Sequence, residues 1–264
     1  MKNELSFEST KKCDLDEISY QSSKKSKISK IKEVILREKL QFAIFVILSL
    51  GILAFTFILS LSNPISFQRF IGEINPILFI SLVFLLGIIL FTFLLSKSWF
   101  HIYRGEFLGG MFRYSIPVFF LAAAVILIDL NFRYPEDINV LFPKSLLFYP
   151  IMAYVVEILF HVLPLSLLLI LLPKIFKNLN FQKIVWFSII IISALEPLYQ
   201  GVLGTPNDFP IGIKIYFGFH LFVFNFLQLY IFKRYGFLSM YSFRVIYYIL
   251  WHVIWGFLRL EILF

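Results

Sequence analysis

The chain has 264 residues, of which 59% are hydrophobic and only 15% are charged, and its mean hydropathy is +0.85. A water-soluble domain of this length carries about a quarter of charged residues, so the composition excludes an ordinary soluble protein. The single cysteine, Cys13, excludes an intrachain disulfide and a cysteine-based metal centre.

A basic segment precedes the first apolar run and contributes much of the net charge of +8. Its basic residues are Lys24, Lys25, Lys27, Lys30, Lys32, Arg37 and Lys39. Such a juxtamembrane segment binds anionic lipid and keeps the N-terminus in the cytoplasm. No aromatic residues alternate with these lysines, so we expect no nucleic-acid partner. Residues 1–38 are predicted to form a disordered cytoplasmic tail, and residues 39–264 a transmembrane bundle.

The apolar runs predict an all-α, polytopic membrane bundle, because about 20 apolar residues span a bilayer as a helix. Seven spans are expected, at 41–61, 76–95, 115–130, 145–172, 183–198, 210–232 and 237–260. The fourth span is long and contains Pro150 and Pro164, so we expect it to be tilted and kinked.

The charges of the predicted loops indicate that the N-terminus is cytoplasmic. Basic residues concentrate in the second, fourth and sixth loops, whereas those of the other loops are fewer or are diluted by acidic residues. The cytoplasmic set is Lys97, Arg104, Lys174, Lys177, Lys183, Lys233 and Arg234. This alternation follows the positive-inside rule and predicts an N-in, C-out topology.

Ionisable residues inside the apolar runs are the candidate functional groups. An ionisable side chain in hydrocarbon is costly unless it faces the bundle interior and has a partner. Glu157 and His161 are four residues apart on the fourth span, so they share a helix face and can hydrogen bond. Glu196 and Gln200 repeat this spacing on the fifth span.

Two further histidines, His220 and His252, lie inside the sixth and seventh spans. At about 1.5 Å per residue from the outer ends of their spans, both are predicted at a depth similar to that of Glu157. A shared polar site is therefore expected. The alternative is that each histidine only hydrogen bonds a neighbouring helix. A zinc ion bound by Glu157, His220 and His252 stays open as a third possibility, although no HExxH motif is present.

Residues 145–260 resemble the CPBP intramembrane proteases, the family that includes CAAX prenyl endopeptidases and bacteriocin self-immunity proteins. That family carries a Glu-Glu-x-x-x-Arg motif, then Phe-x-x-x-His, then His-x-x-x-Asn/Asp. The first motif corresponds to the segment 156–161, with Val156 in place of the first glutamate and His161 in place of the arginine. The second motif can be placed on the segment 193–200, with Gln200 where the histidine belongs, or on the segment 216–220, which keeps His220. The first placement is preferred because it gives the usual separation from His252. The third motif corresponds to the segment 252–256, with Gly256 in place of the asparagine or aspartate.

The resemblance implies a membrane-embedded peptidase. In this hypothesis Glu157 activates a water molecule and His161 orients or assists Glu157, while His220 helps to hold the water and His252 stabilises the oxyanion. The expected substrate is a membrane-associated peptide or protein. Two alternatives stay open: a catalytically impaired relative that acts as a membrane binding or immunity protein, and a small transporter that relays protons.

Overall fold

The computed structural model describes residues 29, 32–62, 65–105, 107–203 and 210–264. All regular elements in this part of the chain are helices, and it contains no strand, so the predicted all-α bundle is confirmed. Most of the predicted tail, including Cys13, lies outside the described residues, and residues 32–37 are helical.

The elements follow one another with short connections. In chain order they are the α-helices α2 (Lys39–Ser62), α3 (Ile65–Ile71), α4 (Pro76–Ser96) and α5 (Phe107–Phe132), the 3-10 helix η1 (Glu136–Ile138), α6 (Ser145–Val156), the π-helix η2 (Glu157–Val162), α7 (Leu163–Ile175), α8 (Phe181–Leu203), α9 (Ile211–Tyr235), α10 (Phe237–Tyr248), the π-helix η3 (Ile249–Trp255) and α11 (Gly256–Leu263). The stretches α6–η2–α7 and α10–η3–α11 each form one continuous helical rod.

Six rods in the described part of the chain are long and apolar enough to cross a membrane. They are Lys39–Ser62, Pro76–Ser96, Ser145–Ile175, Phe181–Gln200, Ile211–Tyr235 and Phe237–Leu263. The third predicted span lies in α5, whose apolar stretch Ile116–Phe132 is shorter. The chain is therefore a multi-pass membrane protein.

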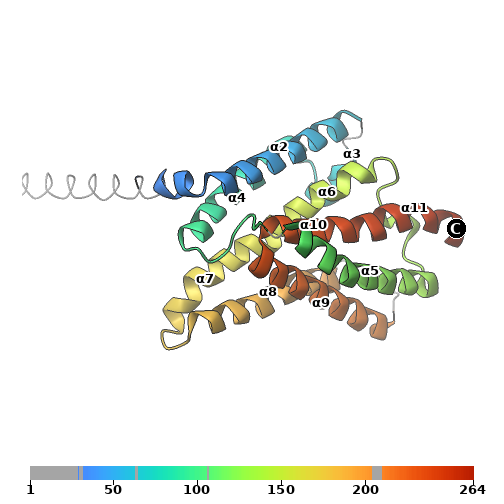
Figure 1. Cartoon of the computed structure of the whole chain (residues 1–264). Helices are drawn as coiled ribbons and strands as arrows, with labels where there is room; N and C mark the ends of the chain where they lie inside the picture. The colour runs from blue at the N-terminus through green and yellow to red at the C-terminus, as the bar shows by residue number, and fades with distance from the viewer. Residues whose placement is uncertain (1–28, 30–31, 63–64, 106, 204–209) are drawn as a thin grey trace, which may run out of the picture.

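The centre of the bundle is formed where α6 and η2 approach α10 (Figure 1). Helices α2 and α4 pack against each other, and α2 packs against α6 while α4 packs against η2 and α7. Helices α8 and α9 pack as a pair, with α8 against η2 and α9 against α10, while α5 packs against α10 and η3. Side chains of η2, α8, α9 and α10 can therefore meet in one place.

The long rod α6–η2–α7 remains a continuous helical stretch although it contains Pro150 and Pro164. Proline lacks an N–H and its ring crowds the carbonyl four residues earlier, which normally kinks a helix. The wide π-turn Glu157–Val162 lies immediately before Pro164, and the Leu163 N–H bonds the Ile158 carbonyl five residues back. The helix thus accommodates Pro164 by widening, and this widened turn carries Glu157 and His161.

A glycine makes the turn between α9 and α10 possible. Gly236 has φ +95°, and a Cβ there would lie 2.9 Å from the carbonyl oxygen of Ile102. The loop before α5 approaches this turn so closely that the Phe237 N–H donates to the His101 carbonyl and the Leu238 N–H donates to the Ile102 carbonyl. This contact fixes the start of α10, and with it the direction in which the helix presents its polar residues.

Candidate polar site at the bundle centre

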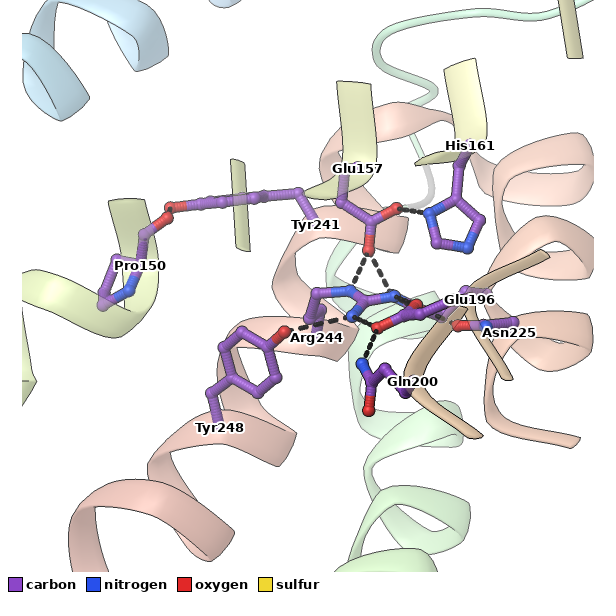
Figure 2. A network of polar contacts seen from close by, with 10 residues as sticks. Pro150, Glu157, His161, Glu196, Gln200, Asn225, Tyr241, Arg244 and Tyr248 are labelled. Atoms are coloured by element: carbon purple, nitrogen blue, oxygen red, sulfur yellow. Dashed lines mark hydrogen bonds and ion pairs between the residues drawn. The ribbon is translucent and has the colours of Figure 1, made fainter. Parts of the chain in front are cut away.

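Arg244 is the centre of a buried charge cluster that joins four elements (Figure 2). It lies on α10 and its side chain is 1% exposed. Its Nε donates to Glu157 Oε1 at 2.7 Å. Its Nη1 and Nη2 donate to Glu196 Oε1 at 3.1 Å and Oε2 at 2.9 Å. Such a two-point arginine–carboxylate pair is among the strongest hydrogen-bonded arrangements in proteins.

Neutral polar side chains complete the surroundings of Arg244. Nη2 also donates to Gln228 Oε1 at 2.6 Å and to Asn225 Oδ1 at 3.1 Å, both on α9. Nη1 donates to the Tyr248 hydroxyl at 3.1 Å, one turn further along α10. Every nitrogen of the guanidinium group is therefore hydrogen bonded. In the apolar interior this saturation is what makes a buried cation tolerable.

The two carboxylates have further partners of their own. Gln228 Nε2 donates to Glu157 Oε1, so that one oxygen accepts from both Gln228 and Arg244. Gln200 Nε2 donates to Glu196 Oε1 at 3.0 Å, which realises the four-residue spacing predicted on α8. One oxygen of Glu157 and both oxygens of Glu196 are thus occupied by donors.

The second oxygen of Glu157 faces His161 on the same π-turn. The distance from Glu157 Oε2 to His161 Nδ1 is 3.2 Å, and both side chains are fully buried. This is an ion-pair distance, but the geometry gives no hydrogen bond between the two atoms, and His161 Nε2 has no hydrogen-bond partner among the described residues. Buried polar atoms without a partner are uncommon, and π-turns in α-helices are frequent at functional sites.

His220 and His252, the other predicted site residues, lie outside this cluster. His220 hydrogen bonds the Tyr247 hydroxyl at 3.0 Å. His252 Nδ1 lies 2.6 Å from Asn139 Oδ1, and its ring stacks on Tyr149 with the ring centroids 4.4 Å apart. In the described part of the chain, no three His, Cys, Asp or Glu residues are arranged to hold a metal ion.

A second buried charge pair connects α5 with α11. Arg259 Nε donates to Asp129 Oδ2 at 2.7 Å, and Nη2 donates to Oδ1 at 3.1 Å. The Trp255 indole N–H donates to the same carboxylate at 2.7 Å. Arg259 also donates to the carbonyl of Tyr134 at 2.7 Å and to that of Pro135 at 3.0 Å. The pair therefore holds the loop that follows α5 against the C-terminal helix.

That loop is itself well packed. Burial, together with the nearby negative charge of Asp129, raises the pKa of Tyr134. The Tyr134 ring also lies edge-on to Trp251, with the ring centroids 5.8 Å apart. A structural role explains all of these contacts, because each donor of Arg259 and each oxygen of Asp129 is paired within the protein.

The structure thus brings together four predicted site residues, Glu157, His161, Glu196 and Gln200, and adds four that were not predicted from the sequence. The added residues are Asn225, Gln228, Arg244 and Tyr248. A signal for Arg244 was available, since it is an ionisable residue within an apolar span, as are the glutamates. The neutral amides gave no comparable signal.

No protein-family model matches the chain, and no curated protein or solved structure is significantly similar to it.

Proposed function

We propose that the chain is a CPBP-type membrane protein that binds a membrane-associated peptide or protein without hydrolysing it. The two segments that resemble the first and second family motifs support the proposed relationship to the CPBP family. Glu157 and His161 from the first segment, and Glu196 and Gln200 from the second, lie in one cluster. Residues that form a common active site in the family are expected to converge in this way.

The third motif supports the proposal that the protein does not hydrolyse its partner. In the family it supplies a histidine and, four residues later, an asparagine or aspartate. On α10 the side chains that reach the cluster are Arg244 and Tyr248, which have this spacing, whereas His252 is held by Asn139. In this assignment an arginine stands where a catalytic histidine is expected.

The single observation that carries the proposal is that Arg244 is bonded to both carboxylates of the cluster. A general base needs a carboxylate lone pair that can take a proton from water within hydrogen-bond reach. Oε1 of Glu157 already accepts from Arg244 and Gln228, so this oxygen is occupied by donors of the protein itself. A water molecule would have to displace one of these donors to reach it.

Hydrolysis is the second candidate, and one observation favours it. Glu157 Oε2 and the His161 ring are adjacent and lack hydrogen-bond partners in the described part of the chain. A water molecule bound beside the pair would be in reach of both a carboxylate and an imidazole. In that case Glu157 acts as the base through Oε2 and His161 as its orienting partner.

We further propose an N-in orientation. The basic residues at the start of α2, between α4 and α5, between α7 and α8 and at the end of α9 belong to one end of an alternating bundle. The opposite end carries the acidic residues Glu73, Glu136, Asp137 and Glu261. This distribution supports a cytoplasmic basic end, where anionic lipid is the expected partner of the N-terminal segment.

The experiment compares wild type with Glu157→Gln, which removes a charge but keeps the shape, in cells of the source organism. Membrane proteins crosslinked to the chain are identified, and new protein termini in the membrane fraction are mapped. We expect both proteins to crosslink to the same partners and to give the same termini. Termini that appear with wild type and disappear with Glu157→Gln would establish hydrolysis instead. An exposed substitution, Lys174→Met, serves as the control for expression level.

A further inference from the structure

Three arginines that belong to neither buried charge cluster gather where α5 begins and α9 ends. Arg104, in the loop before α5, donates from Nη1 to the backbone carbonyl of Arg234 at 3.1 Å. The Tyr235 hydroxyl interacts with the side chains of Arg234 and Arg113, so Arg113 of α5 reaches the same turn of α9. The Tyr235 ring also packs edge-on to Tyr114, with the ring centroids 5.0 Å apart. The contacts between these helices therefore concentrate positive charge on a small area.

The positive charge of Arg104 and Arg113 has no acidic counterpart in the part of the chain that the structure describes. Neither guanidinium group forms an ion pair with a carboxylate there. Both side chains reach the surface, because Arg113 is exposed and Arg104 is partly exposed. Clustered cations favour the binding of an anion, and the planar fork of a guanidinium group matches the oxygens of a phosphate.

The position of Arg113 along α5 places it at the level of lipid headgroups. The apolar stretch of α5 begins at Ile116, three residues after Arg113. In a membrane-spanning chain, cations at the end of an apolar stretch lie at the boundary between hydrocarbon and water. The phosphates of the bilayer lie at the same boundary, so they are the anions most concentrated around Arg113.

The surface of α5 that continues from Arg113 into the membrane is apolar. Arg113, Ile116 and Phe120 are spaced by three and four residues, so they lie on one face of the helix. Ile116 is 62% exposed and Phe120 is 73% exposed, whereas Val118 and Ala122 on the opposite face are buried. A cation above an exposed apolar strip matches a molecule that has both a phosphate and an acyl chain.

We propose that this face of α5, together with Arg104, is a binding site for one anionic phospholipid. The lipid phosphate accepts hydrogen bonds from Arg113 and Arg104, and an acyl chain lies on Ile116 and Phe120. The site is separate from the basic N-terminal segment, since its residues belong to α5 and to the loop before it. The bound lipid offsets the positive charge where α5 meets the end of α9.

Native mass spectrometry of the full chain in detergent tests the contact with the headgroup. Phosphatidylglycerol is titrated into wild type, Arg113→Gln, the double variant Arg104→Gln/Arg113→Gln and the control Lys174→Gln, which removes an exposed cation from α7. One basic residue at a membrane surface changes the affinity for anionic lipid about fivefold. We expect the affinity to fall about fivefold in the single variant and about 25-fold in the double variant, and to stay unchanged in the control. Equal affinities of wild type and the double variant would overturn the proposal.

A second comparison tests the acyl-chain contact without changing any charge. Phe120→Ala is expected to weaken phosphatidylglycerol binding, whereas Phe57→Ala, which shortens an exposed side chain of α2, is the matched control. Phosphatidylcholine, which has no net charge, is expected to bind more weakly than phosphatidylglycerol. Glycerol phosphate at the same concentration is expected not to displace the lipid, and displacement by it would identify a site for free phosphate instead.

The variants also control for misfolding and for the N-terminal segment. All of them retain the basic residues of that segment, so lipid bound there contributes equally to every titration. Melting temperatures in the same detergent are expected to match that of wild type, because Arg113 and Phe120 are exposed. Equal affinities of Phe120→Ala and wild type would exclude the acyl-chain contact and contradict the proposal.

Discussion

Substitution of Arg244 by methionine is expected to be the most damaging single change in the bundle. The side chain is 1% exposed and makes six hydrogen bonds to five residues on η2, α8, α9 and α10. Removing one partner of a buried ion pair costs about 3–5 kcal/mol, because the remaining charge is left without compensation. Here two carboxylates lose their cation, so we expect a loss in the free energy of unfolding at the upper end of that range.

We expect the effects of substitutions at these three positions to be strongly coupled. When Glu157→Gln and Glu196→Gln are added to Arg244→Met, no formal charge from these three residues remains, and replacement of a whole buried ion cluster by uncharged side chains is often nearly neutral. The triple variant is therefore expected to recover most of the lost stability. Reversible unfolding in mixed micelles, followed by circular dichroism, gives the free energies of wild type, the three single variants and the triple variant, which are the five values that the comparison needs.

Two outcomes would refute this account. One is a loss below about 1 kcal/mol for Arg244→Met, the scale of a single exposed ion pair. The other is a triple variant that is as unstable as the sum of its single changes. Lys174→Met removes an exposed cation from α7 and is expected to leave the free energy of unfolding unchanged.

Two further substitutions test the elements around the cluster. Gly236→Ala is expected to cost about 1–3 kcal/mol, because the positive φ and the carbonyl of Ile102 oppose a Cβ. Gly51→Ala, where a Cβ meets nothing within 4 Å, is the control, and equal melting temperatures for the two variants would contradict the prediction. Asp129→Asn is expected to cost about 3–5 kcal/mol because the buried guanidinium of Arg259 loses its counter-charge. Asp129→Leu combined with Arg259→Met should recover much of that loss in the same thermal unfolding measurement, and a double variant no more stable than Asp129→Asn would argue against charge pairing.

The membrane architecture could be predicted from the sequence because a helix that crosses a bilayer must be apolar along most of its length. In lipid every backbone polar group needs an internal partner, so a long apolar run has little alternative to a helix. The i, i+4 spacing was equally informative for Glu157 with His161 and for Glu196 with Gln200, since both pairs lie in the cluster. These predictions depend only on geometry within a single helix.

The shared site was predicted less completely because it depends on how helices are tilted and rotated. Counting residues from the outer end aligned His252 with Glu157, but the structure places Arg244 there, eight residues and about 12 Å earlier along the rod. The rods are 31 and 27 residues long, more than a bilayer requires, so distance from one end is not depth. Asn225 and Gln228 were missed because a neutral amide in an apolar span gives a weak signal until its neighbours are known.

The hydrogen bonds of Arg244 affect both the stability of the bundle and the chemistry that is open to the carboxylates of the cluster. In a bilayer, helices gain little from hydrophobic burial against one another, and packing together with interhelical hydrogen bonds determines how they associate. Arg244 joins α10 to residues of η2, α8 and α9 through bonds that are lost together if the guanidinium moves. A hydrolytic cycle through Glu157 would have to protonate a carboxylate held by this cation and restore it in every turnover. Binding without hydrolysis does not require this step, and this difference is why we propose the non-catalytic function.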